Sequence, residues 1–481
     1  MDSTKGSTAL PRSALETRLH TALVSREQRW IKRRLPDTNT SPSSAGSLLI
    51  DFNSNDYLSL SQSSTLRSLF LERLAKEPDI LGSGGSRLLV NGRAHAALET
   101  RLAKFFRSET ALLFNSGFDA NVGFFSCIPQ AGDAVVYDEY IHASVHDGVR
   151  ASRVAKDMQF AFKHNSIPNL KAVLLQLKRH HGGLRTGETS LFLAVESLYS
   201  MDGTFAPLIE IADLLDDLFP AKNAYFVVDE AHSTGIYGIQ GRGRVSLMGL
   251  ESRVFARLHT FGKALAASGA VVLTNALVHD YLLNYARSLI YTTALSYANI
   301  IAADCSFDML DNGTAQHLSS NLLQLSSYFS STLQERLTSR RIPSSLVSLS
   351  PHLTSTQLIP SLDLSSQLHD ASPIVPILTP HPRPLSSYLL ALGMNARPIT
   401  WPTVPKGKDR VRVCLHAGNS KDEVDRLVSG VIKWAEETMR TSLPGYPAAD
   451  NLPTQISTSV HSQRNEDTCF RVYDGDFQSK L

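Results

Sequence analysis

A lysine and an aspartate carry the strongest chemical signal in this sequence. Lys263 lies in LHTFGKALAASGA (258–270), a loop of small residues that leads into an apolar run. Partial burial there would lower the pKa of the lysine and keep its amine nucleophilic, which suits Schiff-base chemistry. Asp229 lies in AYFVVDEA (224–231), and in open α/β sheets ligands bind beyond the carboxyl ends of strands. The pair predicts a pyridoxal phosphate (PLP) site, where lysine holds the aldehyde and the carboxylate stabilises the protonated ring nitrogen.

Two simpler interpretations of these residues have to be weighed. A lysine that follows a glycine is usually an ordinary surface residue, since lysine is rarely buried. The letters DEAH at 229–232 also occur in helicase nucleotide sites, which need an upstream phosphate loop of the form GxxxxGK[ST]. The sequence has no such loop, because the GKA at 262–264 lies downstream and lacks the serine or threonine. The helicase interpretation is therefore excluded.

The elements around these residues follow a regular alternation. Between about residues 82 and 300, short apolar runs alternate with helical stretches, and runs this apolar suit strands buried on both faces of a parallel sheet. We expect an α/β fold with a large domain, built on a mostly parallel central sheet, and a small α+β C-terminal domain. The expected strands are 110–114, 133–137, 190–197, 224–231 and 270–275 in the large domain, with PIVPIL and RVRVCL in the small one.

The same patterns predict the organisation of the chain. We expect an amphipathic helix over 14–34, a short strand over 48–52, helices over 302–341 and 420–439, and a connection over 342–372. LKRHHGGLRTGET (177–189) is interpreted as an inserted surface loop. The predicted domains are an N-terminal helix and loop (1–47), a PLP-binding domain (48–300), a linking helix with the small domain (301–440) and a flexible tail (441–481).

Composition excludes several classes of protein. The 481 residues are 42% hydrophobic and 19% charged with a net charge of +2, so nothing demands nucleic acid, and KRR at 32–34 is typical of a solvated helix face. The four cysteines are scattered, which predicts neither disulfides nor a metal site. Neither a membrane span nor a secretory signal is expected. The final Ser479-Lys480-Leu481 predicts delivery to the peroxisomal matrix, with the import receptor as a partner.

A dozen short motifs in order resemble the α-oxoamine synthase family of fold-type I PLP enzymes, over about residues 48–438. The resemblance implies a homodimer that condenses an amino acid with an acyl-CoA, in most cases with loss of CO2. The motifs are NSNDYLSL (53–60), GSGGSRLLVNG (82–92), HAALE (95–99), FNSGFDAN (114–121), IHAS (141–144), ESLYSMDG (196–203), VVDEAHSTG (227–235), GRGR (241–244), TFGKA (260–264), YTTAL (291–295), PTVPKG (402–407) and RVRV (410–413).

The resemblance also implies a role for individual residues. Lys263, His142 and Asp229 would be catalytic, with His142 stacked on the cofactor ring. The cofactor would also be bound by Ser116, Gly117 and Phe118 through backbone N–H groups to the phosphate, by Thr260 at the phosphate, by Ser200 and His232 at the ring hydroxyl, and by Thr293 from the neighbouring subunit. Substrate would be bound by Asn55, Glu196, Arg397, Thr403 and Arg412.

Spacing alone cannot choose between two arginines of the last motif. Arg410 and Arg412 are two residues apart, so strand alternation puts them on one face. The family motif favours Arg412 as the residue that grips the substrate carboxylate with its two-donor fork. For Arg410 the expected role is an ordinary surface pair.

Within the family, the sequence favours the branch that joins L-alanine to pimeloyl-CoA in biotin biosynthesis. The N-terminus lacks an Arg-rich transit segment, no membrane anchor is apparent, and the peroxisomal address would put the enzyme near dicarboxylic acyl-CoAs. Arg397 and the basic stretch 32–34 are the expected receivers of the distal carboxylate or the CoA phosphates. Two alternatives stay open: a paralogous aminoketone synthase with other substrates, and a non-catalytic partner subunit, which usually lacks the PLP lysine.

Overall fold

The computed structural model describes residues 13–29, 31–33, 35, 49–354 and 370–441, and the chain divides into two compact units, 1–48 and 49–481. In the first unit, helix α1 (Ala14–Gln28) begins with a capping box in which the Ser13 and Glu16 side chains each accept a backbone N–H of the other residue. None of the α1 residues is buried. The prediction of a helix as far as residue 34 was too long.

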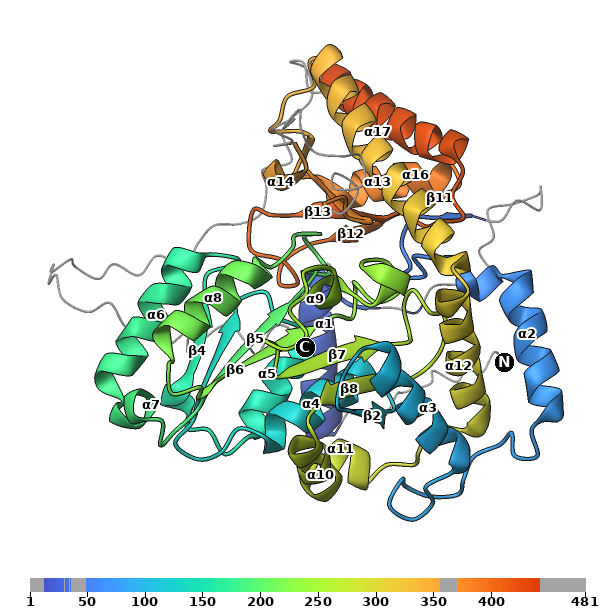
Figure 1. Cartoon of the computed structure of the whole chain (residues 1–481). Coiled ribbons are helices and arrows are strands. Elements are labelled where there is room, and N and C mark those ends of the chain that lie inside the picture. Colours follow the sequence, from blue (N-terminus) through green and yellow to red (C-terminus); the bar gives the residue numbers. More distant parts are fainter. Residues whose placement is uncertain (1–12, 30, 34, 36–48, 355–369, 442–481) are drawn as a thin grey trace, which may run out of the picture. The chain divides into compact units, whose positions relative to one another are not determined.

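The larger unit is built on a seven-stranded sheet with strand order β2-β8-β7-β6-β5-β3-β4 (Figure 1). All pairs are parallel except those of β8, which is antiparallel to both β2 and β7. The mostly parallel sheet confirms the predicted fold class. The strands are β2 (Thr110–Phe114), β3 (Ala134–Asp138), β4 (Gln159–Phe162), β5 (Leu191–Glu196), β6 (Ala224–Asp229), β7 (Ala256–Thr260) and β8 (Ala270–Thr274).

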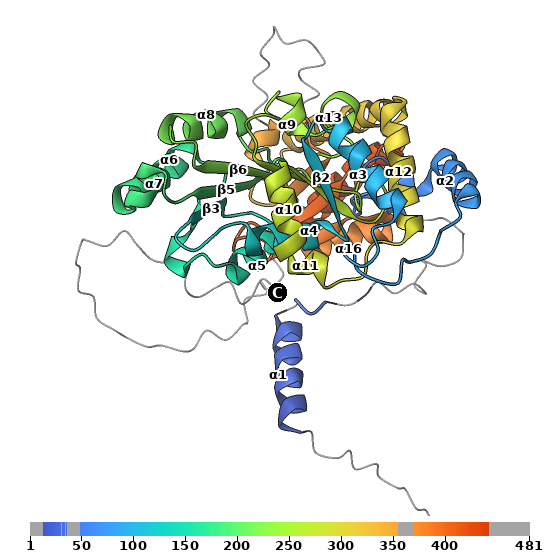
Figure 2. The same ribbon diagram turned by 60° about the horizontal axis from the view of Figure 1, so that its bottom comes forward.

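Helices cover this sheet because its strands are apolar on both faces. All six residues of β5 are buried, as are all five of β7 and of β8. In Figure 2, α6, α7 and α8 gather at the β4 side of the sheet and α3 at the β2 side. The helices are α2 (Ser64–Lys76), α3 (Arg93–Phe105), α4 (Gly117–Cys127), α5 (Ala143–Ala151), α6 (Ile167–His180), α7 (Gly182–Thr186), α8 (Leu208–Leu218), α9 (Arg244–Leu247), α10 (Ala276–Tyr285) and α11 (Arg287–Ile290).

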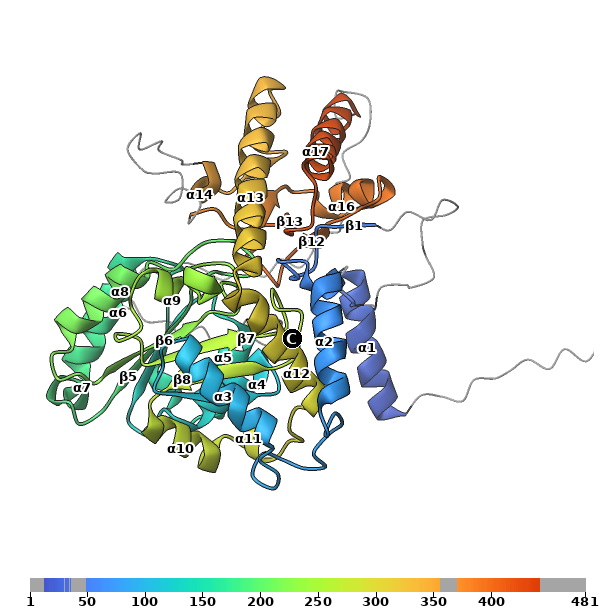
Figure 3. The same ribbon diagram turned by 45° about the vertical axis from the view of Figure 1, so that its right-hand side comes forward.

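A second, antiparallel sheet follows later in the chain. Its order is β12-β13-β10-β9, and a separate two-stranded sheet pairs β1 with β11 in parallel. Figure 3 shows the long helix α13 rising beside this part of the molecule, with α16 and α17 close to it. These elements are β1 (Ile50–Asp51), β9 (Ser348–Leu349), β10 (Ile374–Leu378), β11 (Met394–Asn395), β12 (Arg397–Ile399), β13 (Arg410–Cys414), α12 (Tyr297–Asp311), α13 (Thr314–Ser339), α14 (Pro351–Thr354), α16 (Pro382–Ala391) and α17 (Lys421–Thr441).

A further segment also differs from its prediction. Residues 177–189, interpreted as an inserted loop, contain the last turn of α6 and the whole of α7. Leu177 and Leu184 are buried there, so apolar packing holds the segment in helical form. Three short 3-10 turns, Leu60–Gln62, Lys156–Met158 and Ile239–Gly241, complete the described secondary structure.

Candidate active site

Lys263 and Asp229 are brought together by two adjacent parallel strands. Asp229 is the last residue of β6 and lies in register with Leu258 of β7, which ends two residues later at Thr260. Lys263 follows in the turn after β7. Because parallel strands end at the same edge of a sheet, the amine and the carboxylate both lie at the carboxyl edge.

Lys263 and Asp229 both interact electrostatically with a third ionisable group, the buried carboxyl of Glu196. Glu196 ends β5 in register with Asp229, and burial together with the Asp229 charge raises the pKa of Glu196 well above its usual value. Burial lowers the pKa of Lys263, while Asp229 and Glu196 oppose that effect. The Lys263 amine therefore loses its proton more readily than a surface lysine, as a nucleophile requires.

Asp229 is held by residues that sequence reasoning did not assign. One carboxylate oxygen accepts from Nδ2 of Asn121 at 2.8 Å, and the other accepts from the backbone N–H of Ala231 at 2.9 Å. Asn121 Nδ2 also donates to Oγ of Ser144 at 3.0 Å, and that hydroxyl lies 2.7 Å from Nδ1 of His142. A continuous chain of hydrogen bonds thus runs from Asp229 to His142.

The donors along this chain assign the proton on His142. Asn121 donates to Ser144, so the Ser144 hydroxyl is free to donate to Nδ1 of His142, which also accepts the Ser144 backbone N–H. Although part of the His142 side chain is exposed, desolvation by the surrounding protein lowers its pKa, which favours a neutral ring. The ring proton then sits on Nε2, and the imidazole is fixed in orientation by its Nδ1 edge.

Replacing Asn121 with alanine is expected to lower kcat/KM by about ten- to a hundredfold, since hydrogen bonds to charged groups contribute ~1.5–3 kcal/mol. The substitution removes one partner of Asp229 and the anchor of Ser144. Steady-state kinetics would measure the loss. Asn223→Ala is the matched control, because Asn223 is equally buried and donates to two backbone carbonyls at the other edge of the sheet. Equal losses in both variants would contradict a role for Asn121.

The start of α4 offers a place for a phosphate. Ser116 caps this helix with its Oγ accepting from the Asp119 backbone N–H at 3.0 Å, and a Cβ on Gly117 would lie 3.4 Å from Cβ and 3.6 Å from Oγ1 of Thr260. The first N–H groups of a helix lack intrahelical partners and favour anions. Residues 116–118 therefore form the N-terminus of α4 beside the Thr260 hydroxyl.

The aromatic rings of His142 and Phe118 are exposed next to the N-terminus of α4. Both side chains are exposed, and their ring centroids lie 6.4 Å apart in an edge-on arrangement. His142 follows β3 and Phe118 lies in the first turn of α4, so each belongs to a rigid element next to the carboxyl edge. An anchored but exposed imidazole can stack on a planar ring.

Arg412 has a buried donor without a partner in the described part of the chain. Its NH2 group donates to Oδ1 of Asn55 at 2.7 Å, while Nε is buried and has no hydrogen-bond partner among the described residues. A buried, unpaired guanidinium donor is costly unless an anion binds there. Asn55 and Arg412, which were each predicted to bind substrate, thus contact one another.

The structure separates the two arginines that spacing could not. Arg410 is only 2% exposed, where a surface pair was expected. It forms an ion pair with Asp202, and its guanidinium also donates to the carbonyl oxygens of Met201 and Lys408. Its contacts with Met201 and Asp202 link β13 to the turn that follows β5, whereas Arg412 keeps a free donor.

Arg397 lies next to Arg412, whereas Thr403 stands apart. Arg397 of β12 is the register partner of Arg412 in the antiparallel β13, so their side chains share one face of that sheet. Arg397 is exposed and forms no ion pair with another described residue. Thr403 is exposed in the segment between these strands.

Two predicted cofactor residues are not drawn into the cluster by any described contact. Ser200 stands in the turn after β5, half-buried, and no side-chain hydrogen bond joins it to another described residue. Thr293 is exposed, and its carbonyl accepts from Nδ2 of Asn115, the residue before the α4 cap. Its predicted role concerns a neighbouring subunit and stays a prediction.

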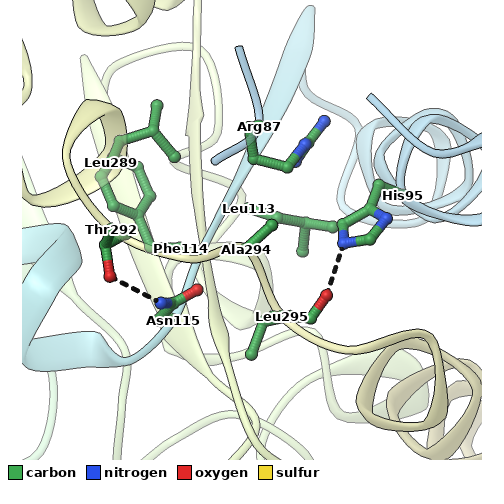
Figure 4. A pocket seen from close by; sticks show the side chains of 9 residues that line it. All are labelled: Arg87, His95, Leu113, Phe114, Asn115, Leu289, Thr292, Ala294 and Leu295. Carbon is green, nitrogen blue, oxygen red and sulfur yellow. Dashed lines mark hydrogen bonds between the residues drawn. The ribbon is translucent and has the colours of Figure 1, made fainter. Parts of the chain in front are cut away.

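Two pockets are lined by neither Lys263 nor Asp229. Figure 4 shows a cavity of about 10 Å³, room for roughly one water, between His95, Asn115 and Thr292. A second hollow of about 340 Å³ lies at the amino ends of β6 and β7, where Arg253 is paired with Asp213 and Asp216. Within the described residues, no group of three or more acidic, histidine or cysteine side chains could hold a metal, and no helix is long and apolar enough to cross a membrane.

The residues at the carboxyl edge fit PLP. An amine with a lowered pKa, a strand-end carboxylate, an exposed imidazole and a helix N-terminus beside a threonine match the aldehyde, the ring nitrogen, the ring face and the phosphate of that cofactor. Asn121, Ser144 and Tyr57, which sequence reasoning left out, all lie inside motifs that it quoted. Their positions were therefore marked, but not their roles.

Comparison with known proteins adds independent evidence. Residues 48–431 match the family model "Aminotransferase class I and II". The chain is 44% identical over 425 residues to an 8-amino-7-oxononanoate synthase of Emericella nidulans, covering 88% of this chain and 96% of the relative. It is 40% identical over 392 residues to the aminoacyl transferase sphA of Aspergillus fumigatus, covering 81% of each. A serine palmitoyltransferase from S. paucimobilis, solved with PLP and myriocin, has a TM-score of 0.70 at 22% identity over 89% of this chain and all of that one, a likeness of fold alone.

Proposed function

Because the chain belongs to the aminotransferase class I and II family and, within it, to the α-oxoamine synthases, we propose that it is a PLP-dependent enzyme that condenses L-alanine with pimeloyl-CoA to give 8-amino-7-oxononanoate, CoA and CO2. The single observation that carries this function is the meeting of Lys263 and Asp229 at the ends of adjacent strands. Arg412, whose buried Nε has no partner among the described residues, adds a donor for a substrate carboxylate. The 44% identical relative named for this reaction supports the choice of substrates.

The residues of the site divide the work of such a reaction. When bound, PLP supplies an electron-withdrawing ring that spreads negative charge from the α-carbon of the amino acid. Arg412 binds the substrate carboxylate, and its partner Asn55 holds the guanidinium in place. Lys263 holds the cofactor and then takes the α-proton on Nζ, which its lowered pKa permits.

The remaining residues of the site would hold the cofactor. Asp229, which is fixed by Asn121, would keep a proton on the ring nitrogen, and His142, which is held by Ser144, would pack against the ring. Thr260 and the first N–H groups of α4 bind the phosphate. The presence of Lys263 argues against a non-catalytic partner subunit.

A second candidate is a paralogous aminoketone synthase with other substrates. The 40% identical relative with the name aminoacyl transferase sphA favours it, since similarity at this level extends over most of the chain to a differently named enzyme. Both candidates share the site described above. They differ in the acyl-CoA and the amino acid.

Release of CoA from the purified protein tests the function. Alanine, glycine and serine would each be paired with acetyl-, pimeloyl- and palmitoyl-CoA, and free thiol would be measured together with the aminoketone. Turnover confined to alanine with pimeloyl-CoA supports the proposal. Activity restricted to another pair favours the second candidate, and no CoA release with any pair contradicts both.

Arg397 is proposed as the receiver of the distal carboxylate. It is exposed and shares a face with Arg412, so two like charges lie side by side on that face. Arg397→Ala is expected to raise KM for pimeloyl-CoA about tenfold with little change in kcat, as for loss of one exposed charge-assisted contact. Acetyl-CoA, which lacks the carboxylate, is the control substrate. An unchanged KM for pimeloyl-CoA would remove Arg397 from this role; the basic stretch at 32–34, partly outside the described residues, would then be the remaining candidate.

Association into a homodimer is proposed because large apolar side chains are exposed on two adjoining segments. Leu89 and Tyr291 are 80% and 73% exposed, and backbone hydrogen bonds from Ala294 to Gly85 and from Tyr297 to Leu81 join the two segments that carry them. Exposed apolar side chains gathered in this way are typical of an interface, and Thr293 lies among them. Sedimentation of the wild type as a monomer at micromolar concentration would contradict the dimer.

Peroxisomal import is proposed from Ser479-Lys480-Leu481, which lies outside the described residues. A fluorescent fusion that keeps this C-terminus should collect in peroxisomes, and deletion of the three residues should leave it in the cytosol. Equal distribution of the two fusions would contradict the proposal.

A further inference from the structure

A buried tyrosine joins the substrate side of the site to the cofactor side. Tyr57 is 0% exposed, and its hydroxyl lies 2.7 Å from Nδ1 of His232 and 3.2 Å from Oδ1 of Asn55. The same Asn55 oxygen accepts from Arg412 at 2.7 Å. No step of the proposed function uses Tyr57, although it touches residues on both sides.

The single proton of the Tyr57 hydroxyl has two acceptors to choose from. Arginine only donates, so the Asn55 atom that faces Arg412 is its carbonyl oxygen, and this oxygen is already satisfied at 2.7 Å. The Tyr57 hydroxyl lies closer to Nδ1 of His232, at 2.7 Å, than to Oδ1 of Asn55, at 3.2 Å. Both facts favour donation to His232.

If Tyr57 donates to Nδ1 of His232, the ring proton of His232 must lie on Nε2. Tyr57 contacts this ring, and three further groups act on it electrostatically: Lys263 from the turn after β7, Arg412 from β13 and His142 after β3. Burial and then the charges of Lys263 and Arg412 lower the pKa of His232 well below its usual value, so the ring is neutral with one proton. That proton sits on Nε2, which has no hydrogen-bond partner among the described residues and is free to donate to the cofactor.

A carboxylate at Arg412 would disturb this arrangement. A bidentate carboxylate draws the guanidinium away from Asn55, whose Oδ1 then lacks a donor. The Tyr57 hydroxyl is the donor nearest to it in the described contacts, so Asn55 competes with His232 for the same proton. Donation from Tyr57 to Nδ1 weakens, and Nε2–H becomes a weaker donor in turn.

We propose that Tyr57 is a positioning residue that reports the occupancy of Arg412 to His232, so that a bound carboxylate weakens the hydrogen bond that His232 donates to the cofactor. This inference rests on the proposed function, because it requires PLP at Lys263. It assigns Tyr57 to coupling between two subsites and not to binding at either one.

The test uses holoenzyme and propionate, which carries the carboxylate of alanine but no amine. The readout is the pH midpoint of the visible absorbance of the bound cofactor, measured with and without propionate. A donor to the cofactor oxygen lowers this midpoint, so loss of donation raises it. In the wild type, propionate is expected to raise the midpoint by about one pH unit, which corresponds to ~1.4 kcal/mol of coupling.

Tyr57→Phe is expected to have a raised midpoint without propionate and less than half of the wild-type response to it, with propionate still bound. Tyr237→Phe is the matched control, because Tyr237 is 1% exposed and its hydroxyl donates at 2.7 Å to the Ala371 carbonyl. The control should keep the wild-type midpoint and response. An unchanged midpoint and response in Tyr57→Phe would overturn the proposal, and so would a response lost only because propionate no longer binds.

A second variant covers the case in which Tyr57→Phe does not hold PLP. Asn55→Ala removes the competing acceptor, so the Tyr57 proton stays on His232. This variant should lose most of the response while propionate still binds, whereas a full response, or a response lost only because propionate no longer binds, would overturn the proposal. A different observation would contradict the proposed function: the wild type would show no visible absorbance band that depends on Lys263.

Discussion

Lys263→Ala is expected to lower turnover by at least about 10⁴-fold, because one side chain both holds the cofactor and moves the α-proton, and a positioned base alone contributes 10²–10⁴-fold. The visible absorbance of the bound cofactor should disappear with the amine. CoA release and the absorption spectrum of the purified protein would measure the two effects.

Retention of the fold distinguishes this result from simple unfolding. Lys263 is partly exposed in a turn, so its truncation should leave the thermal unfolding midpoint of the cofactor-free protein close to that of the wild type. Lys222→Ala is the matched control, since Lys222 is an exposed lysine at the opposite edge of the sheet, paired with Asp216. A Lys263→Ala protein that released CoA at the wild-type rate would end the proposed mechanism.

Asp229→Asn is expected to lower kcat by about 10²- to 10⁴-fold. Losses in this range are typical when a catalytic group can no longer hold or transfer its proton correctly. The amide is nearly the same size but carries no negative charge, so it cannot hold a proton on the ring nitrogen of the cofactor. Its own NH2 group could also face Nδ2 of Asn121, and two donors would then oppose each other. The dissociation constant for PLP and the kinetics of CoA release would be measured together.

A buried carboxylate far from the site controls for the loss of a charge. Asp133 is 7% exposed, close to the 8% of Asp229, and accepts backbone N–H groups of Gln130 and Ser190 at the amino end of β3. Asp133→Asn should reduce stability while kcat stays near the wild-type value. If Asp229→Asn reduced kcat no more than this control, Asp229 would be a structural residue.

Local patterns in the sequence determined the elements and the two central residues. Runs such as 110–114 and 270–275 are so apolar that they can only be buried strands, and β2 and β8 occupy them. The sequence placed Asp229 at the end of a strand and Lys263 in a loop that leads into the apolar run 270–275. The fold class and the choice of the two residues therefore follow from short-range signals, whereas β7 (Ala256–Thr260), the strand that brings Lys263 to the same edge as Asp229, was not among the expected strands.

Only the tertiary structure decided which polar side chains are partners. Strand alternation left Arg410 and Arg412 equivalent, and the choice came from Asp202, more than two hundred residues earlier, which neutralises Arg410 and leaves Arg412 with a free donor. Asn121 with Asp229 and Tyr57 with His232 are likewise contacts across 108 and 175 residues. Periodicity and composition describe the environment of each residue along its own segment, whereas a hydrogen bond depends on distances set by packing between segments, and these exist only once the chain has folded.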